Sequence, residues 1–387
     1  MPQDNQSGAE SPCTAVGRAA RRQIVPPGHL TPAEIQADFA RRQALQAHRA
    51  AAAMGLTRRE FLQVLAGGAA MAAVSTAASA FAQKAAADKS AAAPVAPPAS
   101  GSNAAAPARS RVVVVTHPEV LIKDYRANPP IVRQMLDRAV MELSGAKTEA
   151  EAWRQVGRED DFVAVKYNSM GRPTLESHVE INEAVAAQLA ALAKVDSKKI
   201  LAVDRTVPAP YDELSEPFTL PSRSLATRLR RLYTDQATAI VNVSVLKTHF
   251  GEGQSAALKN HLGSINNPAA YHGWEPDRMP LSIPELNALA PIRTKTRLVI
   301  IDAIRPLYAG GPTDNPDYRW DYRGLIVSKD PVAAEAVGMR VLEAKRAEVR
   351  KKEWPMTAAR LMVAHAQKIG LGQADPARID LVEIKMG

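Results

Sequence analysis

Cysteine is almost absent from this sequence, which contains one, Cys13, among 387 residues. Cys13 lies ahead of a segment that we expect to be cleaved, so the mature protein would contain no cysteine. This excludes disulfide bonds, cysteine-ligated iron–sulfur clusters and cysteine zinc sites in the mature chain. Redox chemistry would need a bound cofactor of another kind, or a metal held by histidine and carboxylate ligands.

Three standard functional motifs are also missing. The sequence has no GxxxxGK[ST] loop, no GxGxxG fingerprint and no GxSxG elbow. It therefore gives no support to nucleotide binding in the first two modes, or to a hydrolase of the third kind. The formal net charge is +9, but no run of Lys and Arg with interleaved aromatic residues occurs, so we expect no binding of nucleic acid.

The N-terminal part has the features of an export signal. The stretch LTRREFL contains Arg58 and Arg59, an apolar run rich in Ala and Gly follows, and AFA precedes Gln83. This arrangement is typical of a twin-arginine (Tat) signal peptide, so we expect residues 56–82 to be cleaved after the Tat translocase delivers the protein to the periplasm. Contact with the membrane would then be transient. The alternative is a retained transmembrane anchor, but a run of Ala and Gly favours cleavage.

Two unusual segments flank this signal. Residues 1–55 are long for the region before a Tat motif, so either this extension is genuine or translation starts at Met54. Residues 83–110 are mainly Ala, Pro, Ser and Gly, which cannot bury enough apolar surface to fold, and we expect a disordered linker there. A single folded domain should span residues 111–387.

Strand and helix patterns alternate along that domain, which predicts an α/β fold with a mainly parallel sheet flanked by helices. The expected strands are 111–116, 162–167, 199–204, 240–245, 298–303, 325–328 and 379–385. The expected helices are 131–143, 178–193, 283–290, 331–345 and 357–369, with a weaker one at 222–232.

In such sheets, polar groups at the carboxyl ends of strands line the ligand crevice. Five expected strands end in this way, which predicts a polar site at that edge. The residues concerned are Lys166 and Asn168, Asp204, Lys247 and His249, Asp302, and Asp330. For Asp330, followed by Pro331, the structural alternative is the N-cap of the next helix.

The most informative stretch is IVNVSVLKTHFGEGQSAALKNHLGSINNP, residues 240–268. We expect a buried strand, a glycine turn, and a short helix that has Ser255 as its N-cap and carries Lys259 and Asn260. Lys247 and Lys259, with the amides of the loop, could bind an anionic small molecule.

A divalent metal is the alternative ligand of this stretch. The three imidazoles of His249, His261 and His272, with the carboxylate of Asp302, form a donor set that suits a first-row transition metal.

Two longer motifs carry a resemblance to a known family. VNVSVLKTHFGEGQSAALKNHLGSI resembles the KTH…KN core of the DUF362 family of uncharacterised bacterial and archaeal proteins, and residues 325–333, LIVSKDPVA, are similar to its S-x-DPVA hallmark. Lys166-Tyr167-Asn168 looks like its early K-x-N, and residues 369–372 like its C-terminal G-L-G turn. The resemblance covers about residues 111–387.

This resemblance implies no established reaction, although many members look Tat-exported. The family often has Asp at the position of Glu335, and some relatives carry cysteine-rich ferredoxin-like parts that this chain lacks.

Taken together, these patterns favour a periplasmic enzyme that acts on an anionic small molecule. Lys247 and Lys259 would hold the anion, with Lys166, Asn168, Asn260 and Asp330 as further ligand-binding residues. His249 would act as acid–base group or metal ligand, and Asp302 and Asp330 would be carboxylate partners. The rival class is a non-catalytic periplasmic binding or maturation protein, and a third is a membrane-anchored structural protein.

Export is predicted to depend on the arginine pair, because the translocase reads it as an address. Replacing Arg58 and Arg59 with Lys should leave the precursor in the cytoplasm, as measured by fractionation of the cells. Unchanged periplasmic yield of the double variant would contradict the Tat assignment. N-terminal sequencing of the exported protein should begin at or near Gln83.

Overall fold

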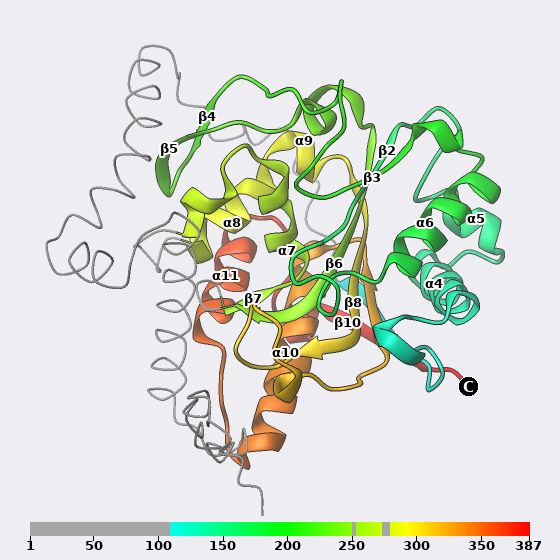
Figure 1. Ribbon diagram of the computed structural model, residues 1–387, viewed down its shortest axis with the longest axis vertical. Coiled ribbons are helices and arrows are strands. Elements are labelled where there is room, and N and C mark those ends of the chain that lie inside the picture. The colour runs from blue at the N-terminus through cyan, green and yellow to red at the C-terminus, as the bar shows by residue number, and fades with distance from the viewer. Residues whose placement is uncertain (1–108, 250–252, 273–278) are drawn as a thin grey trace, which may run out of the picture.

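The computed structural model describes residues 109–249, 253–272 and 279–387 (Figure 1). The predicted export signal, its N-terminal extension and residues 83–108 of the predicted linker lie outside the described residues. Within the described part, no helix combines the length and the apolar character needed to cross a bilayer.

Strands from the whole described chain form one mixed sheet of eight strands, in which seven follow the order β10-β1-β9-β8-β6-β2-β3 and β7 pairs with β6 alone. The bounds are β1 Ser110–Thr116, β2 Val163–Lys166, β3 Ile200–Val203, β6 Ala239–His249, β7 Gly253–Ser255, β8 Thr296–Leu307, β9 Gly324–Ser328 and β10 Ile379–Lys385. All seven strands expected from the sequence are therefore present, and β6 and β8 extend beyond their expected ends.

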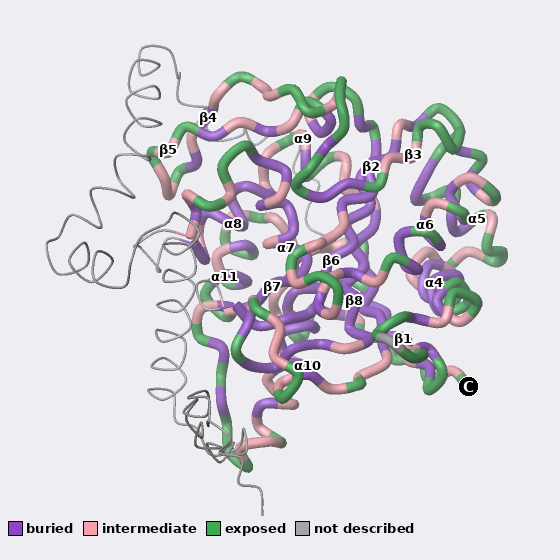
Figure 2. Tube along the Cα trace, viewed as in Figure 1, coloured by how far each residue is buried: buried purple, intermediate pink, exposed green. Residues whose placement is uncertain are grey.

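Helices cover both faces of this sheet, as the two sides of Figure 1 show. One face packs against α4 (Pro129–Ser144), α5 (Glu149–Trp153) and α6 (Val179–Ala191). The other packs against α7 (Ala257–Asn260), α8 (Met279–Ala288), α9 (Ala290–Arg293), α10 (Pro331–Arg350) and α11 (Thr357–Lys368). The central strands are buried from both sides, as the tube in Figure 2 shows. This arrangement confirms the expected α/β class.

Along the seven-strand order, β9 is the exception to the parallel arrangement. It runs antiparallel to both of its neighbours, β1 and β8, whereas the pairs β1–β10, β8–β6, β6–β2 and β2–β3 are parallel. The carboxyl end of β9 therefore lies where the neighbouring strands β1 and β8 begin, at the opposite end of the strands from their carboxyl ends. As a result, Asp330 is far along the sheet from the polar groups with which the sequence analysis grouped it.

The prediction of a weak helix at 222–232 is wrong. Most of that stretch belongs to a separate two-stranded hairpin, formed by β4 (Phe218–Leu220) and β5 (Arg223–Thr227), with a π-helix at Leu232–Gln236 after it. Contacts with distant residues hold it extended: Arg223 donates to the carbonyls of Ala270 and Tyr271. These contacts decide the conformation here, because the helical pattern of the sequence is weak.

Asp330 is the N-cap of α10, which confirms the structural alternative for this residue. Its Oδ1 accepts from the backbone N–H groups of Val332 (2.8 Å) and Ala333 (3.0 Å). Its Oδ2 accepts from the Ser110 hydroxyl (2.6 Å) and from the Gln373 backbone (2.9 Å). One carboxylate thus fastens the start of β1 and the loop before β10 to the longest helix.

Asp330→Ala is predicted to lower the free energy of unfolding by about 1–3 kcal/mol, because it removes a helix cap and leaves buried donors unpaired. Urea denaturation measures this loss. Asp375→Ala is the matched control, since Asp375 caps a short exposed turn through one N–H group, that of Ala377. Equal losses in the two variants would contradict the wider role of Asp330.

Candidate functional site

β6 carries Lys247 and His249 at its carboxyl end, in the middle of the sheet. The chain then returns as β7, which pairs antiparallel with β6 so that Lys247 faces Ser255. α7 begins only at Ala257, after Ala256, and no side chain caps it. The expectation that Ser255 caps this helix is therefore wrong. Residues 253–255 lie in a strand rather than at a helix N-terminus, and the rest of the glycine turn, 250–252, lies outside the described residues.

A cavity of about 200 Å³ opens at the carboxyl ends of β2, β3 and β6. Its floor includes Ser244 and Ser255, and the Pro268–His272 turn closes one side. The lining includes most of the residues that the sequence analysis assigned to a site, namely Asn168, Lys247, His249, Lys259, Asn260 and His272. The cavity also contains Arg205 and Asp204, so basic groups dominate its charge among the described lining residues.

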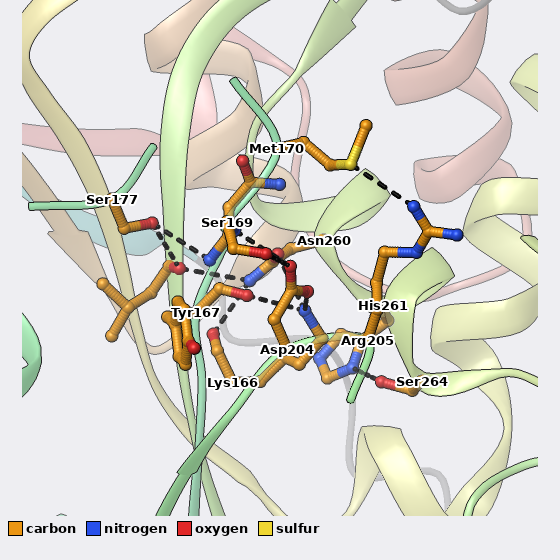
Figure 3. A network of polar contacts seen from close by, with 12 residues as sticks. Lys166, Tyr167, Ser169, Met170, Ser177, Asp204, Arg205, Asn260, His261 and Ser264 are labelled. Atoms are coloured by element: carbon orange, nitrogen blue, oxygen red, sulfur yellow. Dashed lines mark hydrogen bonds and ion pairs between the residues drawn. The ribbon is translucent and has the colours of Figure 1, made fainter. Parts of the chain in front are cut away.

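Behind the wall of this cavity, Lys166 is fully buried and has three hydrogen-bond acceptors (Figure 3). Its Nζ donates to Asp204 Oδ1 (2.6 Å), to the Tyr167 carbonyl (2.7 Å) and to Asn260 Oδ1 (3.1 Å). Burial would raise the pKa of Asp204, but Lys166 and two bonds from Ser169 bring it below its usual value. Asp204 is therefore a carboxylate, and the pair is a buried salt bridge.

Asn260 links this salt bridge to the central strands. Its amide nitrogen donates to the Lys166 carbonyl (2.9 Å), to Asn242 Oδ1 (2.7 Å) and to the Val243 carbonyl (3.2 Å). Asn242 in turn donates to the Ala257 carbonyl (2.8 Å) at the start of α7. Because its own polar atoms are used in this way, Asn260 positions α7 against the sheet.

Lys247 is also held by three acceptors, all from the loop that follows β2. Its Nζ donates to Asn168 Oδ1 (3.0 Å), to the Met170 carbonyl (2.5 Å) and to the Leu175 carbonyl (3.1 Å). Burial lowers the pKa of Lys247 to about 7. The ammonium therefore fixes the 168–175 loop over the cavity while it contributes charge to the lining.

Lys259 has a different kind of partner. Its Nζ lies 3.2 Å from His272 Nε2, and His272 Nδ1 lies 2.9 Å from the Pro268 carbonyl. A carbonyl only accepts, so the proton of His272 is on Nδ1 and its Nε2 presents a lone pair to Lys259. Burial and the positive charge of Lys247 lower the pKa of Lys259 to about 7.

His249 and His272 are neighbours, with ring centroids 5.3 Å apart. Burial and Lys259 lower the pKa of His272 to about 4 and take that of His249 well below its usual value. Both imidazoles are therefore neutral at pH 7. In this form a ring nitrogen can accept a proton or a hydrogen bond from a substrate.

His261 does not join the other two histidines. It is fully buried, its ring packs edge-on against Tyr233, and its Nδ1 lies 3.4 Å from the Ser264 hydroxyl. In the described parts of the chain, no three His, Cys, Asp or Glu side chains are grouped closely enough to hold a metal ion. The predicted histidine trio is thus not brought together, and the metal stays a prediction.

Asp302 also lies apart from the cavity, on the face of the sheet that α6 covers. Its Oδ2 accepts from the backbone N–H (2.8 Å) and Nδ1 (2.7 Å) of His178, and its Oδ1 accepts from the Ile304 backbone (3.0 Å). Burial opposes protonation of His178, but Asp302 holds its pKa above the usual value. Strand alternation separates the two sites: Val243 of β6 faces α6, whereas Ser244 faces the cavity.

The sequence analysis missed the role of Glu335, which supports the cavity from behind. It is completely buried on α10, and its Oε1 accepts from Gln254 Nε2 (2.7 Å) while its Oε2 accepts from the Leu258 backbone (2.8 Å). Burial raises its pKa to about 7. Glu335 thus holds β7 and the first turn of α7, the turn that carries Lys259. The available signal was that Glu335 is the one charged residue in the apolar run VAAEAVG, residues 332–338.

A larger cavity, of about 430 Å³, opens at the other end of the strands, where β1 and β8 begin. Several of its polar groups are already used in structural contacts: Arg111 pairs with Asp380, Lys329 donates to Gln155, and Asp330 caps α10. The smaller cavity is the better candidate, because its lysines have strongly lowered pKa values and its neutral histidines face the same space.

Comparison with known families agrees with the central motifs. Residues 206–340 match the family described as "Domain of unknown function (DUF362)". This part of the chain is therefore similar to that family. The match contains the segment from β6 to α7 and the DPVA cap of α10, but not the K-x-N residues 166–168 or the G-L-G turn. No curated protein and no solved structure matches the chain.

Glu335 is predicted to make stability fall between pH 4.5 and about 7. Its pKa is raised from 4.5 to about 7 in the folded state, so in this window the folded protein holds a proton that the unfolded chain has lost. Each pKa unit corresponds to about 1.4 kcal/mol, so the effect amounts to roughly a few kcal/mol.

The difference in unfolding free energy between wild type and Glu335→Gln, followed against pH, isolates this effect because Gln does not titrate. Glu348→Gln is the control, since Glu348 is exposed on the same helix. A difference between wild type and Glu335→Gln that stays constant from pH 4.5 to 8 would contradict the prediction.

Proposed function

We propose that this DUF362-domain protein is an exported enzyme that acts on an anionic small molecule in the cavity at the carboxyl ends of β2, β3 and β6. The export part of the proposal rests on the twin-arginine pattern of residues 56–82. The single observation that supports the ligand class is the convergence of Arg205, Lys247 and Lys259 on one small cavity.

Charge supports an anion as the ligand. Among the described lining residues the acidic group is Asp204, and one of its oxygens already bonds Lys166. Cations gathered in a partly buried space repel one another, which is reflected in the pKa of Lys259, lowered by Lys247, Arg205 and Lys166 after burial itself. A bound anion would relieve this repulsion, and each charge-assisted hydrogen bond would add about 1.5–3 kcal/mol.

Acid–base groups support catalysis over simple binding. Lys259 changes its charge near pH 7, and it is in contact with a neutral imidazole, that of His272. His249 lies beside that ring. Such a pair can pass a proton to or from a substrate at neutral pH, because Lys259 titrates there and the lone pair of the neutral imidazole can accept a proton.

The second candidate function is a non-catalytic binding or maturation protein that uses the same cavity. The buried salt bridge of Lys166 and Asp204 favours it, because a rigid cationic cavity alone suffices for binding. Steady turnover of one member of a panel of small anionic metabolites would establish the enzyme. Saturable binding without turnover would establish the binding protein.

Sulfate, phosphate or a small dicarboxylate is predicted to raise the thermal midpoint of the protein, and to do so more at pH 6 than at pH 9. Lys247 and Lys259 have pKa values of about 7, so both are charged at the lower pH and largely neutral at the higher. Anion affinity should therefore fall as pH rises through about 7.

Lys259→Ala is predicted to weaken this binding roughly 10- to 150-fold, which is the loss of one charge-assisted hydrogen bond. Lys198→Ala, which removes an exposed lysine, should leave binding unchanged. Full stabilisation by the anion in Lys259→Ala would show that Lys259 is not part of the site. The absence of stabilisation by every anion tested would overturn the proposal.

A further inference from the structure

Three lysines lie in or directly behind the cavity, and their surroundings differ. Lys166 and Lys247 each have three oxygen acceptors, which matches the three N–H groups of an ammonium ion. Both are completely buried. These two lysines are thus held by contacts within the fold, and they can act on a ligand through their charge but cannot turn toward it without breaking those contacts.

Lys259 is suited to covalent chemistry. Its side chain is half-buried and lines the cavity, and its Nζ contacts the lone pair on His272 Nε2 at 3.2 Å. An imidazole in this tautomer can take a proton from the ammonium and leave a nucleophilic amine. Neighbouring cations such as Lys247 and Arg205 favour the neutral amine further, a common way to activate a lysine nucleophile.

A carboxylate would find a place next to this amine. Arg205, at the exposed rim, and Lys247, in the wall, line the same cavity as Lys259. The cavity has a volume of about 200 Å³, below the roughly 300–1,000 Å³ common for larger ligands. A ligand of this cavity would therefore be a compact acid, with its reactive carbon only a few bonds from the carboxylate.

The floor of the cavity provides a polar group that the fold itself leaves without a partner. The hydroxyl of Ser244 is 1% exposed and has no hydrogen-bond partner among the described residues, although it lies in the cavity lining. A buried hydroxyl without a partner lowers stability. A carbonyl oxygen of a ligand in this cavity would satisfy it.

We propose that Lys259 forms a Schiff base with a small oxo acid, whose carboxylate pairs with Arg205 near the charge of Lys247 and whose carbonyl oxygen accepts from Ser244. This assignment rests on the proposed function, since it needs an anion in the same cavity. The Nζ lone pair forms a bond to the carbonyl carbon, and the oxygen takes a proton to give a carbinolamine. Loss of that hydroxyl with a proton, as water, leaves a C=N bond in place of C=O, with no redox change.

His272 is in place to move the protons of this sequence. Its Nε2 accepts one from the Lys259 ammonium before attack and can return it to the departing hydroxyl. The imine then withdraws electrons from the adjacent carbon, which assists breaking of a C–H or C–C bond there. The reaction class is therefore transformation of an oxo acid at the carbon next to its carbonyl.

Borohydride trapping tests the Schiff base. The purified protein is incubated with glyoxylate, pyruvate or acetoacetate, reduced with sodium borohydride, digested and mapped by mass spectrometry. We expect one of these acids to leave a secondary amine on Lys259, with the exposed Lys198 in the same digest as the control for non-specific reaction. Glycolate, lactate and 3-hydroxybutyrate, which have no ketone or aldehyde, should raise the thermal midpoint without leaving an adduct.

Lys259→Arg is the matched variant, because it keeps the positive charge but cannot form an imine. It should lose the adduct and retain anion-dependent stabilisation. If that variant does not fold, the position of the adduct in the wild-type map still decides.

Stabilisation of the wild type by oxo acids with no adduct at Lys259 would overturn the Schiff base and leave the anion site standing. Labelling of Lys198 to the same extent as Lys259 would also overturn it. The absence of stabilisation by every oxo acid, hydroxy acid, phosphate and sulfate would overturn both proposals.

Discussion

Moving the Lys166 ammonium out of water costs several kcal/mol unless its charge and its N–H groups find partners inside the protein. Those partners come from three separate elements: the Tyr167 carbonyl just after β2, Asp204 just after β3, and Asn260 on α7. Each must be in its native position for the charge to be tolerated. The salt bridge therefore fixes the two strand ends and the short helix relative to one another.

Close packing around this salt bridge explains a glycine in the central segment. A Cβ added at Gly263 would lie 2.8 Å from Asp204 Oδ1 and 3.0 Å from Lys166 Nζ. Only glycine lets the backbone come this near to the pair. From the opposite side, Glu335 holds the first turn of α7. Two buried polar contacts thus fix the position of Lys259. Its neighbour Asn260 bonds Lys166, and the backbone of Leu258 bonds Glu335.

The cavity itself has the opposite character. Its cations are gathered without enough negative charge among the described residues to balance them, and burial with mutual repulsion lowers the pKa values of Lys247 and Lys259. An arrangement of this kind lowers stability and is common where a protein binds or transforms a ligand. In this protein the buried salt bridge and the cationic cavity have one residue in common, Asp204.

The sequence by itself determined the α/β class and the seven strands, and it pointed to the segment from Lys247 to Asn260 as the centre of a candidate site, because hydrophobic period and polar strand ends are local signals. Tertiary structure alone decided which of those polar ends meet. The direction of β9 separates Asp330 from the cavity, and the face on which Asp302 lies pairs it with His178. Strand direction and partner identity depend on contacts between residues far apart in the sequence. Glu335 bonds Gln254, 81 positions away, and Asp302 bonds His178, 124 positions away. No window of sequence contains both members of such a pair.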